Sequence, residues 1–311
     1  MIKICFIGLG SIGQRHLRNL TRIKNVGKDC EIYAIRSVGV VLPDELENHI
    51  TRVYSSIEEA PTDFDVIFVT NPTSMHYDTI KKTISHTKHM FIEKPVFMDD
   101  IKSMNELSLK KDSVYYVAAP MRHCPVIQKL REILSNEKVY SVRAISSSYL
   151  PEWRKGIDYR KCYSAMKSMG GGVELDLIHE IDYMTYLFGK PKKTICVKGK
   201  FSSLEIDSND LADYILVYED KLAEIHVDYF GRNAMRKIEV FCENYTIVGD
   251  FLDNTLKYVG PDYVKEVELK PDEDYMDEMK HFLALIEGQE ENDNDICYAN
   301  KILKMAKGEE E

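Results

Sequence analysis

The sequence lacks an excess of basic residues. Its 311 residues include 41 Lys and Arg against 51 Asp and Glu, which gives a formal net charge of −10. A nucleic acid or an anionic membrane would require a basic face, so neither is an expected partner. No apolar run approaches the roughly 18 residues of a membrane span, and no signal-peptide pattern precedes Ile2. These absences predict a cytoplasmic protein.

Metal-binding and redox spacings are absent as well. The seven cysteines never form C-x-x-C, and the nine histidines never form H-E-x-x-H. We therefore expect no metal site and predict that the cysteines are small buried hydrophobic residues. There is no internal repeat or low-complexity segment, and the length fits two domains.

The first two dozen residues carry the strongest signal. An apolar run over residues 2–7 meets a G-x-G-x-x-G motif at residues 8–13, and an amphipathic segment follows. In a strand, turn and helix, the first glycine makes the turn, the second lets backbone approach a pyrophosphate, and the third allows close helix packing. The helix N-terminus then favours the phosphates. The predicted dinucleotide-binding residues are Gly8, Gly10, Ser11, Ile12 and Gly13.

A second predicted strand, residues 31–35, ends in Arg36 and Ser37. An NAD site usually has Asp or Glu about 20 residues past the glycines, whereas an arginine there can pair with a 2′-phosphate. We therefore expect NADP(H) as the preferred cofactor, with NAD(H) as the alternative.

Strands and helices alternate through the first 120 residues. Predicted strands at 65–70, 89–92 and 114–119 are separated by predicted helices at 75–86 and 99–110. This series predicts a doubly wound parallel sheet, and we assign residues 1–122 to it. Ligands bind at the carboxyl ends of such strands, where Asn71, Pro72, Glu93 and Lys94 also lie.

From residue 139 the pattern changes to strands without intervening helices. Predicted strands cover 139–149, 193–199, 211–218, 222–230 and 236–243. They predict an α+β domain over residues 123–311, with a largely antiparallel sheet and helices on one face. The uncovered sheet face predicts a homodimer or homotetramer.

A glycine triplet at residues 170–172 precedes helical apolar spacing over 174–188. Asp176 and His179 are three residues apart, so they are expected on one face of a single helix. The triplet would allow close approach of a ligand, which favours a catalytic His179 as much as a structural one. Trp153, Arg154 and Tyr159 suit sugar stacking and an anionic substituent, although aromatic residues beside a sheet are more often core.

These motifs together resemble the glucose-fructose oxidoreductase and inositol dehydrogenase family, also called Gfo/Idh/MocA. The resemblance rests on the N-terminal glycine motif with His16, on Asn71-Pro72 with His76, on Glu93-Lys94-Pro95, and on the Gly-Gly-Gly…Asp…His…Asp pattern of residues 170–182. It implies a Rossmann domain followed by a largely antiparallel sheet domain. It also implies a nicotinamide cofactor between the domains and a sugar, inositol or related substrate.

The resemblance assigns roles to individual residues. Lys94 corresponds to the family's lysine, Asp176 to its aspartate and His179 to its acid-base histidine, while His76 and Glu93 join the cofactor-binding set. Histidine titrates near neutrality and suits proton abstraction from a hydroxyl, and a lysine cation suits a developing alkoxide.

The spacing of Asp176 and His179 departs from many family members, in which four residues separate the pair. The sequence instead resembles a bacterial subgroup associated with surface-polysaccharide sugars, so the partnership of Asp176 with His179 stays open. An NAD-assisted lyase or glycoside hydrolase of the same fold and a non-catalytic ligand sensor are the alternative functions.

Overall fold

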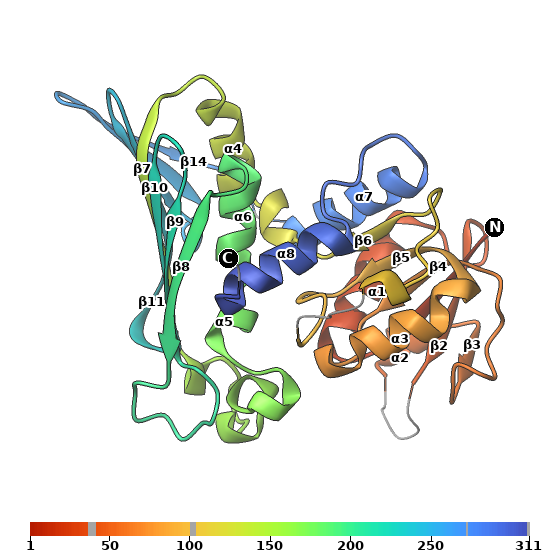
Figure 1. Cartoon of the computed structure of the whole chain (residues 1–311). Helices are drawn as coiled ribbons and strands as arrows, with labels where there is room; N and C mark the ends of the chain where they lie inside the picture. The colour runs from red at the N-terminus through yellow and green to blue at the C-terminus, as the bar shows by residue number, and fades with distance from the viewer. Residues whose placement is uncertain (37–41, 100–103, 272, 310–311) are drawn as a thin grey trace. The chain divides into compact units, whose positions relative to one another are not determined.

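A computed structural model describes residues 1–36, 42–99, 104–271 and 273–309 (Figure 1). The described part of the chain divides into two compact units. The first comprises Met1–Ala118 and Tyr275–Asn300, and the second Ala119–Asp274 and Lys301–Glu311. The predicted division at 122/123 did not anticipate that residues 275–300 return to the first unit.

The first unit contains a parallel sheet. Among the described residues its six strands lie in the order β3-β2-β1-β4-β5-β6, and every neighbouring pair is parallel. The strands are β1 (Ile2–Ile7), β2 (Cys30–Ile35), β3 (Arg52–Tyr54), β4 (Phe64–Val69), β5 (Thr87–Ile92) and β6 (Tyr115–Val117). This order confirms the doubly wound sheet.

Helices cover both faces of the parallel sheet, which explains why its strands read as continuous apolar runs. The core on one face includes residues of α1 (Ser11–Ile23), α2 (Asp44–Glu47) and α7 (Asp274–Ile286). The predicted helix over residues 75–86 is found as α3 (His76–Thr83), which contacts β4. The ring centroid of Phe282 in α7 lies 5.7 Å from that of Phe68 and 5.2 Å from that of Phe91.

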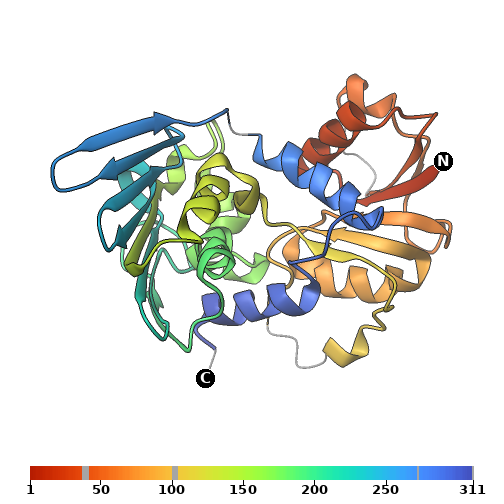
Figure 2. The same cartoon turned by 90° about the horizontal axis from the view of Figure 1, so that it is seen from above.

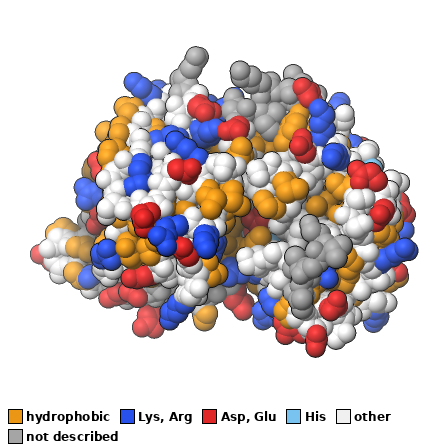
Figure 3. All heavy atoms as spheres, turned by 90° about the horizontal axis from the view of Figure 1, so that it is seen from below, with side chains coloured by type: hydrophobic (Ala, Val, Ile, Leu, Met, Phe, Trp, Pro, Cys, Tyr) orange, Lys and Arg blue, Asp and Glu red, His pale blue; other side chains and the backbone are white. Residues whose placement is uncertain are grey.

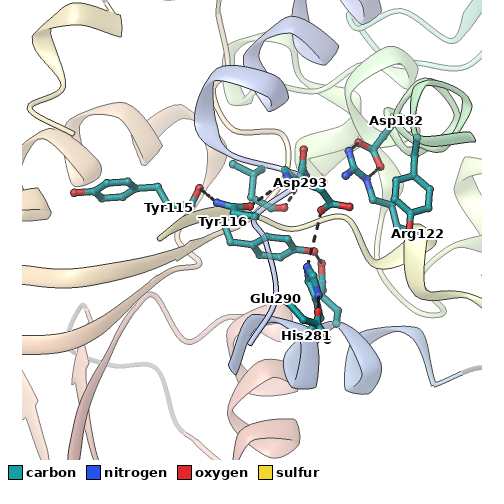
Figure 4. A network of polar contacts seen from close by, with 12 residues as sticks. Tyr115, Tyr116, Arg122, Asp182, His281, Glu290 and Asp293 are labelled. Atoms are coloured by element: carbon teal, nitrogen blue, oxygen red, sulfur yellow. Dashed lines mark hydrogen bonds and ion pairs between the residues drawn. The ribbon is translucent and has the colours of Figure 1, made fainter. Parts of the chain in front are cut away.

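The segment after α7 completes the edge of the parallel sheet. The Val117 N–H donates to the Asn294 carbonyl at 2.9 Å, and the Asn294 amide donates back to the Val117 carbonyl at 2.7 Å. Tyr116 donates its hydroxyl to Glu278 of α7 at 3.2 Å. In Figure 4, His281 of α7 lies beside Glu290, which belongs to the segment that follows α7. These contacts explain why residues far apart in sequence form one unit.

The predicted helix over 99–110 is wrong within the described residues. A single 3-10 turn, η3 (Met104–Glu106), is found there, and residues 108–110 have no helical structure. Lys110 instead bonds outward, its N–H to the Tyr115 hydroxyl at 3.2 Å and its ammonium to the Thr87 carbonyl at 2.8 Å. Tertiary contacts therefore replace helical bonds at this end of the segment.

The second unit contains a mixed sheet, whose eight strands in the described residues lie in the order β14-β13-β12-β11-β7-β10-β9-β8. The β7–β10 pair is parallel and the other pairs are antiparallel. The strands are β7 (Val139–Tyr149), β8 (Lys193–Gly199), β9 (Leu211–Val217), β10 (Leu222–Asp228), β11 (Phe230–Cys242), β12 (Thr246–Asp250), β13 (Thr255–Val259) and β14 (Val264–Glu268). The sequence prediction missed the last three.

Helices α4 (Pro125–Leu134), α5 (Val173–Asp176) and α6 (His179–Phe188) lie on one face of the mixed sheet (Figures 1 and 2). Ala223, Ile225 and Val227 of β10 are buried, whereas Leu222 and Glu224 are exposed. This alternation is typical of a sheet with a single covered face. The remaining helix, α8 (Ile296–Lys307), is divided between the units at Asn300.

The surface carries mixed charge on the face that Figure 3 draws, where acidic and basic side chains alternate over short distances. Among the described residues, no helix is long and apolar enough to span a membrane. Five of the seven cysteines are buried as predicted, but Cys196 is half-buried and Cys297 is exposed.

Candidate functional site

The carboxyl ends of four adjacent strands carry most of the predicted cofactor-binding residues. Strands β2, β1, β4 and β5 are neighbours in the parallel sheet, and they end just before Arg36, Gly8, Thr70-Asn71 and Glu93. The structure therefore brings these residues to one edge of the first unit, as predicted.

Gly8 and Gly13 are required by close backbone packing. Gly8 has φ +91°, and a Cβ there would lie 2.8 Å from the Asn71 backbone. A Cβ on Gly13 would lie 2.5 Å from the Gly8 carbonyl oxygen and 2.8 Å from the Thr70 hydroxyl. The Thr70 hydroxyl itself donates to the Gly8 carbonyl at 2.5 Å. These two glycines thus fix how α1 and the turn before it meet β4.

Gly10 has a different reason to be glycine. A Cβ there would meet no atom of a described residue within 4 Å, so space rather than packing surrounds it. It precedes Ser11 at the start of α1, where no described side chain caps the helix and the first turn holds no acidic residue. The N–H groups and positive dipole end of α1 therefore fit a pyrophosphate.

Arg36 follows β2, where its N–H donates to the Tyr54 carbonyl at 3.2 Å. Its side chain is 15% exposed, and Nη2 lies 3.9 Å from Oε1 of Glu47 on α2. The arginine is thus at the predicted strand end, with a carboxylate at the outer limit of an ion pair. Ser37 lies outside the described residues.

Asn71 and His76 are tied to each other, whereas Pro72 is exposed between them. The Asn71 amide donates to the Thr79 hydroxyl at 2.8 Å, and Nε2 of His76 lies 2.9 Å from the Asn71 carbonyl. His76 is 1% exposed, and burial lowers its pKa even though carbonyl oxygens surround the ring. These side chains shape the turn after β4.

Glu93 is buried and accepts two hydrogen bonds. Oε1 lies 2.5 Å from Nε2 of His16, and Oε2 accepts the N–H of Lys94 at 3.1 Å. Burial alone raises the pKa of Glu93, but His16, Lys94 and His76 together hold that pKa below its ordinary value. The carboxylate is therefore charged and occupied within the unit, and the half-buried Lys94 follows it.

In the second unit the predicted single helix over 174–188 is wrong. Asp176 is the last residue of α5 and His179 the first of α6, because Leu177 leaves helical geometry with ψ 29°. The two residues therefore do not lie on one face of one helix. Asp176 accepts the hydroxyl of Tyr229 at 2.6 Å, and burial together with this carboxylate raises the pKa of Tyr229, which keeps its proton.

The glycine triplet packs against protein. A Cβ on Gly171 would collide with the carbonyl oxygen of Tyr163, while Gly170 and Gly172 have φ +82° and +143°. The Gly171 N–H donates to the Met166 carbonyl at 2.9 Å. Close ligand approach is therefore not what requires the middle glycine.

His179 is 8% exposed at the start of α6, and buried ion pairs hold the helix around it. Arg122 donates to both oxygens of Asp182, at 2.9 and 2.6 Å, and Figure 4 shows the two side chains face to face. Arg236 of β11 donates to the fully buried Glu180 at 2.7 Å. Breaking one such pair typically costs about 3–5 kcal/mol, so the backbone of His179 is firmly placed.

Trp153, Arg154 and Tyr159 line one small hollow with a cavity volume of about 10 Å³. Trp153 donates its indole N–H to Ser148 at 2.9 Å, and its ring stands perpendicular to Tyr229 at 5.2 Å. The hollow is smaller than the roughly 300–1,000 Å³ of typical ligand sites, so by itself it does not hold a nucleotide sugar.

Sequence reasoning missed Tyr229, Arg122 and Arg236, which hold the carboxylates of Asp176, Asp182 and Glu180. Only the tertiary fold brings these partners together, and no local motif marks them. Among the described residues, no group of three His, Cys, Asp or Glu side chains could hold a metal ion.

Two family models cover most of the chain. The model described as "Oxidoreductase family, NAD-binding Rossmann fold" matches residues 2–119, and the "GFO/IDH/MocA C-terminal domain" matches residues 127–248. The chain is 24% identical over 312 residues to myo-inositol 2-dehydrogenase of Thermotoga maritima, covering 93% of this chain and 89% of that relative.

Two further proteins are similar. The uncharacterized oxidoreductase YrbE of Bacillus subtilis is 28% identical over 223 residues, which span 69% of this chain and 63% of that relative. The solved structure of UDP-N-acetylglucosamine 3-dehydrogenase from Acidithiobacillus ferrooxidans matches with a TM-score of 0.79 at 20% identity, covering 99% of this chain and 96% of that one. The structural likeness shows the shared fold.

The glycines give a test of the nucleotide site. Gly10→Ala should leave the melting temperature unchanged, because its Cβ enters open space, yet weaken NADPH binding by about tenfold or more by obstructing the pyrophosphate. Gly13→Ala should lower the melting temperature, because its Cβ meets backbone. Calorimetry and fluorescence titration measure both, and normal NADPH affinity in the Gly10 variant would contradict the assignment.

Proposed function

Because this chain belongs to the Gfo/Idh/MocA oxidoreductase family, whose N-terminal domain is an NAD-binding Rossmann fold, we propose that it is a sugar-type dehydrogenase or reductase. The reaction interconverts a CH–OH and a carbonyl group of a sugar, sugar nucleotide or inositol-like substrate. The observation that supports it most is the placement of the glycine turn and Glu93-Lys94 at the carboxyl ends of β1 and β5, the two strands that flank β4 in that domain.

The chain's own residues must bind the substrate and move one proton. The bound nicotinamide would supply or accept the hydride. His179, at the buried start of α6, is proposed as the base that takes the hydroxyl proton during oxidation. Its backbone is held by the ion pairs of the next residues in α6, so little reorganisation is needed.

Lys94 is proposed to stabilise negative charge on the same oxygen as the proton leaves. Asp176 accepts a hydrogen bond from the Tyr229 hydroxyl, so one of its carboxylate oxygens is already engaged. It is therefore proposed to orient substrate hydroxyls rather than to act as a second base. Trp153, Arg154 and Tyr159, which share one hollow, are proposed to contribute to substrate binding. Two similar proteins, an inositol dehydrogenase and a UDP-sugar dehydrogenase, support ring carbinols as the substrate class.

His179→Ala should leave NADPH affinity nearly intact and lower turnover by about a hundredfold or more, because a positioned acid-base group is lost. Lys94→Ala should behave similarly. The matched controls are His86→Ala and Lys88→Ala, which lie at the opposite, amino end of β5 and should keep turnover. Steady-state kinetics beside nucleotide titration decide the question, and near-normal turnover in His179→Ala would place the proton acceptor elsewhere.

The cofactor is proposed to be NADP(H) in preference to NAD(H), because Arg36 stands where an NAD site has an acidic residue. NADPH should bind more tightly than NADH, and Arg36→Asp should flatten or reverse the difference by about 1–3 kcal/mol. Arg22→Asp, at the far end of α1, is the control. Tighter binding of NADH by the unmodified protein would reject this preference.

The exposed face of the mixed sheet is proposed as the interface of a homodimer or homotetramer. At one edge Ile195 and Val197 of β8 are 43% and 59% exposed, and Leu222 of β10 is 49% exposed. Strand register places all three on the face opposite the buried side chains of β9 and β10.

Light scattering should give a mass of two or four 36 kDa chains at micromolar concentration. Leu222→Lys should weaken the assembly, since it puts a charge into the apolar part of the face. Leu252→Lys, in the turn after β12 and 58% exposed, is the control and should leave the mass unchanged. A monomeric unmodified protein would rule the interface out.

A further inference from the structure

The histidine of α1 that faces Glu93 has no part in the proposed proton transfer. His16 is fully buried, with its ring 4.7 Å from that of Phe91 and inclined to it by 60°. Its Nε2 lies 2.5 Å from Oε1 of Glu93, whereas Nδ1 has no hydrogen-bond partner among the described residues. Burying a polar ring that makes a single hydrogen bond costs free energy of folding, so we looked for a role of that hydrogen bond that offsets the cost.

The charge on Glu93 fixes the direction of this bond. An ionised carboxylate only accepts, so Nε2 of His16 must carry the hydrogen. The other side of the ring lies near the aromatic rings of Phe91 and Tyr275.

The second carboxylate oxygen of Glu93 forms a hydrogen bond with the backbone of Lys94. It accepts the Lys94 N–H at 3.1 Å, while the Glu93 N–H donates to the Val69 carbonyl at 2.9 Å. Glu93 is thus tied to α1, to β4 and to the next residue. Losing the His16 bond would free the carboxylate to rotate about its side-chain bonds and release the Lys94 amide.

We propose that His16 is a positioning residue for Lys94, and that it acts through the carboxylate of Glu93. The hydrogen bond, rather than the packing of the ring, fixes the backbone from which the Lys94 side chain extends. The effect of His16 on turnover rests on the proposed function of Lys94. The effect of His16 on the position of the Lys94 backbone does not depend on that function.

Three substitutions separate the bond from the packing. His16→Phe keeps the ring and removes the donor. His16→Asn keeps a polar side chain whose amide falls short of the Nε2 position, whereas the longer His16→Gln brings an amide donor to that position. The Asn and Gln variants are matched in polarity, so they keep the comparison available if the Phe variant fails to fold.

The decisive readout is amide hydrogen exchange of Lys94, followed by NMR in the full-length protein without cofactor. Exchange should rise by about tenfold or more in His16→Asn and His16→Phe and by less than about threefold in His16→Gln. The Thr70 N–H, which donates to the Ile7 carbonyl at 3.0 Å, is the internal control and should not change. Unchanged Lys94 exchange in the Asn variant, or an equal rise in the Gln variant, would overturn the proposal.

Kinetics test the functional consequence separately. In His16→Asn, turnover should fall by about tenfold or more at unchanged NADPH affinity, and His16→Gln should recover most of the loss. If Lys94 exchange responds as expected while turnover does not, the link from His16 to Lys94 stands and the proposed role of Lys94 fails.

Discussion

The backbone of Gly8 runs against the backbone of Asn71 with no room for a side chain between them. This contact joins the turn after β1 to the end of β4, and the Thr70 hydroxyl closes it by bonding the Gly8 carbonyl. Gly13 then lets the first turn of α1 pack on the same point. The open N-terminus of α1, the space at Gly10 and the neighbouring strand ends all depend on this approach.

Both units use buried carboxylates to place the residue beside them. Glu93, bonded to His16, precedes Lys94, and Glu180, bonded to Arg236, follows His179. Asp182, two residues further along α6, accepts two hydrogen bonds from Arg122. Each carboxylate would be costly to bury alone, and its partner comes from a distant part of the chain. The proposed catalytic side chains therefore extend from backbone that is fixed by a long-range hydrogen bond in the first unit and by long-range ion pairs in the second.

Local motifs predicted the strand ends of the first unit, because the turn that a glycine allows and the strand that an apolar run forms are each determined by a few neighbouring residues. The break between Asp176 and His179 could not be predicted, since Leu177 and Ile178 carry no helix-breaking signal. Tyr229, Arg122 and Arg236 were missed because only the fold pairs them with their carboxylates. The return of α7 to the first unit was missed too, because its apolar side chains fill a core formed by other strands.

The proposed function requires net hydride transfer to or from a ring carbinol. The most direct test incubates the protein with NADPH deuterated at C4 and a panel of oxidised sugars, sugar nucleotides and inositols, and follows the product by mass spectrometry. The account predicts one deuterium on the reduced carbon and one oxidised cofactor for each product formed. A substrate that is cleaved or dehydrated while the deuterium stays on the cofactor would contradict it and indicate a lyase or hydrolase.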